Sequence, residues 1–124
     1  MTESRALVSV VDDDESVRES LPHLLAVCGY RAQAFSSAEE FLASGSIAQT
    51  RCLILDVAMP GMSGPELQRE LASRRETVPI VFITAHKEES DRPQLLARGA
   101  VDCLFKPFSE SALLEAVEKA LQAG

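Results

Sequence analysis

Five polar side chains suited to metal and phosphate chemistry stand at the ends of apolar stretches of the sequence. Asp12 and Asp13 follow the first stretch, and Asp56 follows the third. Thr84 ends the fourth stretch, and Lys106 comes directly after the fifth. Each stretch is short and bounded by polar residues, which is typical of a buried strand. The five side chains therefore occupy the same position relative to their strands.

Three of these side chains are carboxylates, which repel one another if they converge. At about 4 Å and an effective dielectric near 20, each pair costs roughly 4 kcal/mol, so such a cluster favours a bound cation. A few oxygen ligands, with positions left for water, suit Mg²⁺ better than Ca²⁺ or Zn²⁺. The sequence therefore predicts that Asp12, Asp13 and Asp56 form a Mg²⁺ site, in which Mn²⁺ could substitute. Thr84 and Lys106 add a hydroxyl and a cation that can donate to phosphate oxygens.

Asp56 is also the best candidate for a nucleophile, because a carboxylate can form an aspartyl phosphate. It alone follows a wholly apolar strand and precedes a rigid turn, Met59-Pro60-Gly61. Taken singly, these residues also have structural interpretations. The run Asp12–Glu15 suits the start of a helix, and Lys106 suits a strand exit. Their occurrence together at the ends of four strands favours a functional site.

The position of these residues depends on a regular alternation of apolar and amphipathic segments. This alternation predicts one α/β domain over residues 1–124, with a five-stranded parallel sheet covered on both faces by five helices. In the doubly wound order 2-1-3-4-5, ligand sites form at the carboxyl edge where strand order reverses. The predicted strands are Ala6–Val11, Tyr30–Phe35, Cys52–Leu55, Pro79–Ile83 and Ala100–Phe105. The predicted helices are Asp14–Cys28, one capped by Ser37 and Glu40, one with Pro65 in its first turn, Arg92–Arg98, and one capped by Ser109.

The composition excludes several classes of protein. The 12 basic and 19 acidic residues leave a net charge of -7, which argues against a nucleic-acid-binding face in these residues. No apolar run approaches the roughly 18 residues of a membrane span, and Met1–Arg5 has no signal-peptide core behind it. We therefore expect a cytoplasmic protein without a membrane partner. Because Cys28, Cys52 and Cys103 are odd in number and far apart, we expect reduced, buried thiols rather than a disulfide or zinc site.

Four segments that contain the five polar residues resemble the receiver domain of two-component response regulators, in order and in spacing. Three further segments, 12–18, 37–42 and 99–102, resemble the nitrogen-fixation-regulator branch, whose members usually carry a helix-turn-helix DNA-binding domain after the receiver. The resemblance spans nearly the whole chain and implies a flavodoxin-like receiver fold. The four segments are Val10–Asp14, Leu55–Gly64, Ile83–Ala85 and Lys106–Phe108.

The resemblance implies a role for each of these residues. Asp56 accepts a phosphoryl group from a sensor histidine kinase, so the domain is a phosphoacceptor switch and not a turnover enzyme. Asp12 or Asp13 holds Mg²⁺ together with Asp56 and the backbone carbonyl of Ala58. The residues that contact the phosphoryl oxygens are Thr84 and Lys106.

Phosphorylation is then expected to change an output surface formed by the fourth helix, the fifth strand and the fifth helix, through which homodimers could form. The family carries an aromatic residue three positions before the lysine, where this chain has Cys103. We interpret Phe105 as facing the other side of its strand, so that it does not replace this ring. The signal is therefore expected to pass mainly through Thr84 and the loop Ala85–Glu89. The resemblance also implies a cis peptide bond between Lys106 and Pro107.

Other functions stay open at this point. The chain could be a stand-alone receiver or a pseudo-receiver that only binds proteins, although the presence of all five polar residues disfavours the latter. An aspartyl hydrolase of the haloacid dehalogenase type needs a second acid two residues after the nucleophile, where this chain has Ala58. A flavin protein with the same fold needs aromatic residues around the flavin ring, but the chain has no Trp and Tyr30 is its single Tyr.

Overall fold

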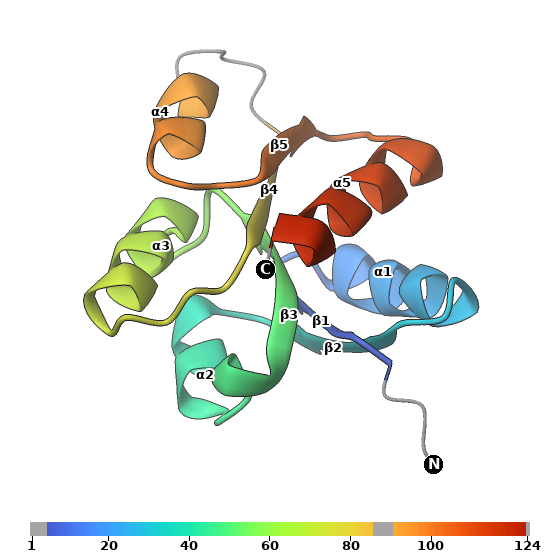
Figure 1. Cartoon of the computed structure of the whole chain (residues 1–124), viewed down its shortest axis with the longest axis horizontal. Coiled ribbons are helices and arrows are strands. Elements are labelled where there is room, and N and C mark those ends of the chain that lie inside the picture. Colours follow the sequence, from blue (N-terminus) through green and yellow to red (C-terminus); the bar gives the residue numbers. More distant parts are fainter. Residues whose placement is uncertain (1–4, 86–90, 124) are drawn as a thin grey trace.

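The computed structural model describes residues 5–85 and 91–123, which form a sheet with helices on both faces (Figure 1). The predicted alternation of strands and helices is confirmed. The strands are β1 (Leu7–Val11), β2 (Arg31–Phe35), β3 (Thr50–Asp56), β4 (Ile80–Thr84) and β5 (Asp102–Phe105). The helices are α1 (Glu15–Val27), α2 (Ala38–Ala43), α3 (Gly64–Ser73), α4 (Asp91–Ala97) and α5 (Glu110–Ala123), with a short 3-10 helix at Ile47–Gln49.

The strands pair in parallel in the order β2-β1-β3-β4-β5, as the sequence predicted. In the pairing of β1 with β3, Val11 lies opposite Leu55. The residue that follows each of them in the sequence is an aspartate, so the register brings Asp12, just after β1, beside Asp56, the last residue of β3. This is the carboxyl edge at the point where strand order reverses, where ligands bind in sheets of this type.

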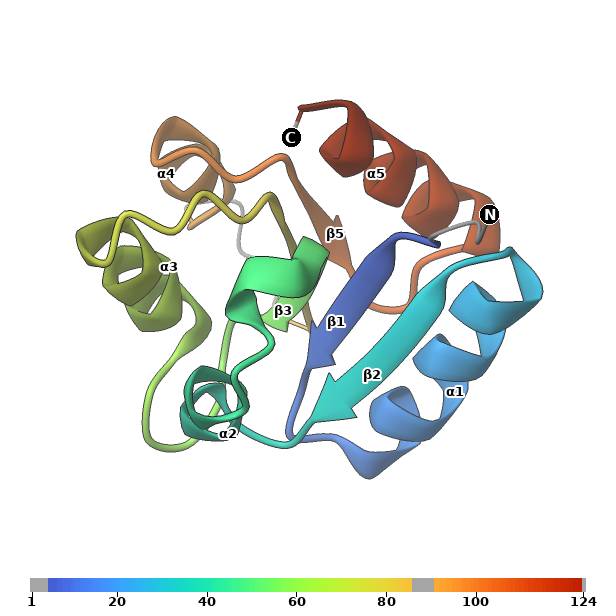
Figure 2. The ribbon, with the colours of Figure 1, turned by 60° about the horizontal axis from the view of Figure 1, so that its bottom comes forward.

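The five helices divide between the two faces of the sheet. Helices α1 and α5 cover one face, and α2, α3 and α4 cover the other (Figures 1 and 2). Because successive side chains of a strand point to opposite faces, β3 supplies both cores: Ile54 packs in the cluster with Leu113 of α5, whereas Leu55 packs in the cluster with Leu67 of α3. Strand β2 lies at the edge and is only partly buried, as its half-polar sequence predicted.

Two expectations drawn from composition have different outcomes. Within residues 5–85 and 91–123, no helix combines the length and apolar character needed to cross a membrane. None of the three cysteines, all of which lie in the described part of the chain, forms a disulfide, and Cys52 and Cys103 are buried as predicted. The prediction is wrong for Cys28, which is exposed. It is the C-cap residue of α1, where the chain has already left the face of the helix that packs on the sheet.

Gly64, the first residue of α3, allows this helix to start against the end of β3. A Cβ atom at this position would overlap the backbone carbonyl oxygen of Asp56 and lie 3.0 Å from the ring of Phe82. The Gly64 N–H donates to the carbonyl of Val57 at 3.0 Å, which closes the β3–α3 segment onto itself. The close approach of backbone to backbone therefore requires glycine here, although its φ is not in the left-handed region.

We expect Gly64→Ala to destabilise the fold by about 3 kcal/mol, the upper end of the range for overpacking, because the obstructing atom belongs to the backbone. Gly45→Ala is the matched control. Gly45 has a φ of +77° but open space around it, so its substitution should cost only the roughly 1–2 kcal/mol of left-handed strain. Urea unfolding of both variants measures the difference, and an equal loss of stability would contradict the steric argument.

Candidate functional site

The three predicted carboxylates meet at the carboxyl edge of the sheet. Asp12, Asp13 and Asp56 each place a carboxylate oxygen within 4.8 Å of the others. Asp12 is fully buried and Asp56 is 6% exposed, whereas Asp13 lies in the exposed turn between β1 and α1. The cluster therefore has a buried base and one side open to solvent.

Lys106 crosses from the end of β5 to the two buried carboxylates. Its Nζ lies 2.9 Å from Asp12 Oδ2 and 3.9 Å from Asp56 Oδ1. Burial lowers the pKa of Lys106, but the hydrogen bond to Asp12 and the charge of Asp56 outweigh burial, so the pKa is raised above its ordinary value. The lysine therefore stays cationic, yet one ammonium faces three carboxylates.

Burial and the excess of negative charge together make Asp56 a weaker acid than an ordinary aspartate. Burial, followed by the charge of Asp12, raises the pKa of Asp56 from 3.8 to about 7, against the opposing effect of Lys106. A hydrogen bond with the Asp12 side chain and the charge of Asp13 raise it further. With this pKa, the Asp56 carboxyl is close to its titration midpoint at neutral pH. A bound cation would displace the proton and leave the carboxylate ionised.

Thr84 and Ala58 flank this cluster. Thr84 is buried at the end of β4, and its carbonyl accepts a hydrogen bond from the Lys106 N–H at 2.8 Å. This backbone bond fixes the position from which the Lys106 side chain extends. The expected cis peptide between Lys106 and Pro107 is confirmed. Ala58 is exposed in the β3–α3 segment, two residues beyond Asp56. Of the predicted loop Ala85–Glu89, residues 86–89 lie outside the described residues.

Comparison with known proteins decides the family. The sequence model of the protein family described as response regulator receiver domain matches residues 8–118 of the chain. The chain belongs to the response regulator receiver family. This receiver has the acidic pocket formed by Asp12, Asp13 and Asp56 together with Lys106, and it is a phosphoacceptor signalling protein of a two-component system rather than a turnover enzyme.

Its relatives include transcriptional response regulators of the branch that the sequence indicated. Nodulation protein W of Bradyrhizobium diazoefficiens is 44% identical over 119 residues, 96% of this chain and 52% of that protein. The crystal structure of FixJ-N matches with a TM-score of 0.85 and 36% identity, covering 98% of this receiver and 96% of that chain. Response regulator StyR matches with a TM-score of 0.90 and 46% identity, covering 97% of this receiver and 61% of that chain. The receiver spans about half the length of the curated relatives that it matches.

The donor set of the receiver fits a hard divalent cation. Carboxylate oxygens are the ligands that Mg²⁺ prefers, and Mg²⁺ keeps several of its waters, which the exposed side at Asp13 permits. Sulfur and imidazole ligands, which would favour Zn²⁺, are not part of this cluster. The acidic triad is typical of the receiver metal site.

One sequence interpretation near the site is wrong. The sequence interpretation places Phe105 on the opposite face of β5 from Cys103, but residues two apart in a strand share a face. The packing agrees, because Cys103 belongs to the core beneath α2, α3 and α4, whereas Leu104 packs against the core beneath α1 and α5. Phe105, opposite Thr84 in the pairing of β4 with β5, therefore lies on the Cys103 side of the strand.

Sequence reasoning also missed two residues that fix the loops around the acidic cluster. The Arg18 guanidinium donates to the backbone carbonyl of Asp12 at 3.1 Å, which ties α1 to the β1–α1 turn. Glu39 of α2 accepts a hydrogen bond from the Met62 N–H at 3.0 Å. The contact of Arg18 could have been found from the sequence, because Arg18 lies one turn inside the helix that follows Asp12. The contact of Glu39 with Met62 leaves no such signal, because it joins segments that are distant in sequence.

We expect the raised pKa of Asp56 to make the metal-free receiver less stable as pH rises from about 4 to about 7. Below this window Asp56 is protonated in both the folded and unfolded states, whereas above it the folded state carries an unfavourable buried charge. Asp56→Asn removes this titration. In EDTA, the melting temperature of the variant should therefore exceed that of wild type by a gap that widens from pH 4 to 7 and then stays constant.

Glu115→Gln, on the exposed side of α5, is the control for loss of a carboxylate and should track wild type across this range. A constant gap between Asp56→Asn and wild type from pH 4 to 8 would show that Asp56 has an ordinary pKa.

Proposed function

We propose that Asp56 is the phosphoacceptor of this receiver and takes a phosphoryl group from a sensor histidine kinase. The observation that carries the proposal is Lys106 Nζ, held between Asp12 and Asp56 at 2.9 and 3.9 Å. A cation so close to Asp56 is placed to contact a phosphoryl oxygen attached to that carboxylate. Asp56 is also the carboxylate that lies at the end of the central buried strand.

In the proposed transfer, an ionised Asp56 oxygen forms the new P–O bond while the bond from phosphorus to the leaving group breaks. The leaving imidazole of the kinase takes the electron pair of that bond. Bound Mg²⁺ would supply neutralisation of the charge on the phosphoryl oxygens and the carboxylates. Asp12, Asp13 and Asp56 would hold it together with the Ala58 carbonyl. Lys106 and the Thr84 hydroxyl would donate to the remaining phosphoryl oxygens.

The proposed switch starts from the change in charge at Asp56. Phosphorylation adds roughly one further negative charge and three acceptor oxygens, which would draw Lys106 and Thr84 toward the phosphoryl group. Thr84 ends β4 and precedes α4 in the chain, and Lys106 lies between β5 and α5. A movement of these two residues would therefore reach the output surface. A bias of a few kcal/mol is enough to shift such an equilibrium.

The proposed output surface is formed by α4, β5 and α5, with homodimerisation as one consequence. Ion pairs already join its parts: Asp102 of β5 lies 3.1 Å from Arg92 of α4 and 3.8 Å from Lys119 of α5. Arg92 Nε also donates to the carbonyl of Cys103 at 3.3 Å. A shift of α4 against β5 would therefore change which charges this surface presents to a partner.

We also propose that residues 1–124 are one receiver domain of a cytoplasmic regulator that controls transcription through an attached DNA-binding domain. Relatives named as transcriptional regulatory proteins, such as FixJ of Rhizobium meliloti, support this proposal at 38% identity. That the receiver covers 55% of FixJ leaves room for an output domain in proteins of this type. The acidic net charge of the receiver, -7, suits protein contacts better than nucleic acid.

Incubation with acetyl phosphate and Mg²⁺ should add one phosphoryl group, detected by mass spectrometry. Asp56→Asn should abolish the addition because it removes the nucleophilic oxygen, and EDTA should abolish it in wild type. Asp102→Asn, at the start of β5, is the control that should be labelled normally. Full labelling of Asp56→Asn would refute the assignment, and unlabelled wild type would favour a pseudo-receiver.

We expect Thr84→Ala to permit phosphorylation but to weaken the response of α4 and β5, because the variant lacks the hydroxyl that follows the phosphoryl group. Thr84→Ser, which keeps the hydroxyl, should respond normally. Cys103→Ala should cost only about 1 kcal/mol as a small core deletion and should keep the response. Amide chemical shifts of residues 91–105, before and after phosphorylation, measure all three variants. Loss of the response in Cys103→Ala with retention in Thr84→Ala would reverse the proposed route.

A further inference from the structure

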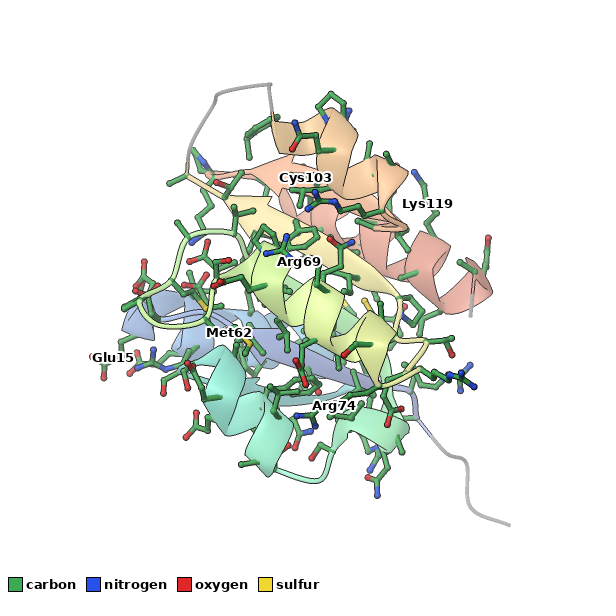
Figure 3. All side chains as sticks on the ribbon, turned by 90° about the vertical axis from the view of Figure 1, so that its left-hand side faces the viewer. Glu15, Met62, Arg69, Arg74, Cys103 and Lys119 are labelled. Carbon is green, nitrogen blue, oxygen red and sulfur yellow. The ribbon has the colours of Figure 1, made fainter. Side chains whose placement is uncertain are left out.

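A carboxylate from α2 is seated against the segment that leads from β3 to α3. Glu39 Oε2 accepts the Met62 N–H at 3.0 Å, across 23 residues of sequence. The neighbouring Gly61 has a φ of +75°, and a Cβ atom there would lie only 2.8 Å from the same oxygen. Figure 3 shows Met62 beside α2. The Glu39 carboxylate therefore bonds the backbone of Met62 and fills the space that a side chain at Gly61 would need.

The segment in question, residues 57–63, contains the backbone carbonyl expected to hold the metal. Its first residue is fixed by a hydrogen bond from the Val57 N–H to the carbonyl of Ile83, at 3.0 Å. Its last residue, Ser63, forms the capping box of α3 with Glu66. Met59 is buried in the core beneath α2 and α3. Ala58 thus lies between Val57 and Met59, which are both held in place. Glu39 adds a contact further along the segment, at Met62.

The N-terminus of α2 is capped without Glu39. The Ser37 hydroxyl accepts the N–H of Glu40 at 3.0 Å, and the Glu40 carboxylate accepts the N–H of Ser36. The Ser37 half of the predicted capping box is therefore confirmed, but the other half is wrong, because Glu40 accepts the N–H of Ser36 instead of that of the N-cap residue Ser37. Glu39 is exposed and directs its carboxylate away from its own helix, onto the loop.

We propose that Glu39 is a positioning residue for the metal-binding loop: its hydrogen bond to Met62 holds the turn after Asp56 in the shape that presents the Ala58 carbonyl. This inference rests on the proposed Mg²⁺-dependent phosphorylation. Glu39 acts through the backbone and is not itself a metal ligand. A loop already held in its bound shape loses less conformational freedom when the cation binds, so the affinity for the cation rises.

The proposal separates affinity for Mg²⁺ from reactivity once Mg²⁺ is bound. Glu39→Ala should weaken Mg²⁺ binding by about threefold to tenfold, the range that one hydrogen bond supports. The rate of phosphorylation by acetyl phosphate should fall at low Mg²⁺ and return to the wild-type rate at saturating Mg²⁺. Because Glu39 is exposed, the melting temperature of the metal-free protein should stay close to that of wild type.

The experiment compares Glu39→Ala with Glu39→Gln and Glu40→Ala in the same chain. Mg²⁺ affinity is measured by calorimetry, and the loop is followed by hydrogen exchange of the Met62 amide without metal. Glu39→Gln should keep the protection and affinity because its amide oxygen accepts the same hydrogen bond. Glu40→Ala, which loses the hydrogen bond to the Ser36 N–H just before the same helix, should lower stability and leave Mg²⁺ affinity unchanged.

Unchanged Mg²⁺ affinity in Glu39→Ala would overturn the proposal, as would an equal loss of affinity in Glu40→Ala or Glu39→Gln. If Glu39→Ala lowered the melting temperature strongly, Met62 exchange in wild type would still test the proposal, because a Met62 amide without protection there would show that the hydrogen bond does not exist. Failure of wild type to bind Mg²⁺ or to be phosphorylated would refute the proposed function itself, which is a separate result from unchanged affinity in Glu39→Ala.

Discussion

The ion pair between Asp12 and Lys106 is the interaction on which the rest of this site depends. Asp12 has no exposed surface, and a buried carboxylate without a partner costs several kcal/mol. Lys106 Nζ meets it at 2.9 Å but is shared with Asp56 at 3.9 Å. The lysine therefore neutralises one charge of three. Burial, together with the remaining negative charge, raises the pKa of Asp56 and creates the need for a cation.

The fold tolerates this unfavourable cluster of charge, because its stability comes from the two hydrophobic cores on either face of the sheet. Strands β1, β3 and β4 are buried on both faces, between the core with α1 and α5 and the core with α2, α3 and α4. Parallel pairing then aligns the strand ends, so that the residue after β1, Asp12, and the last residue of β3, Asp56, lie side by side. The strain is confined to one edge, where Gly64 also allows the backbone of α3 to approach Asp56 closely.

The same strands connect the acidic cluster to the surface that we propose for output. Lys106 follows β5, whose first residue, Asp102, holds ion pairs with α4 and α5. Thr84 ends β4, and its carbonyl bonds the Lys106 backbone. A change in charge at Asp56 would therefore act on residues that are one strand length from the proposed output surface, without a long pathway through the core.

The sequence by itself determined the elements and the five polar residues of the site. Apolar strands and amphipathic helices leave local periodic signals, and Asp12, Asp56, Thr84 and Lys106 are recognisable because each stands at the end of a strand. The alternation also favoured a doubly wound sheet, but the particular order 2-1-3-4-5, one of two common orders for such sheets, came from the family resemblance.

Only the tertiary structure decided how the loops around the site are held and which side chains are covered. The bond from Met62 to Glu39 joins two segments that no local pattern relates. The exposure of Cys28 depends on where α1 leaves the sheet, and the sharing of Lys106 between two carboxylates depends on distances across three strands. Periodicity reports which face of an element is apolar, but contacts between loops and the competition of charges for one partner arise only when the elements are packed together.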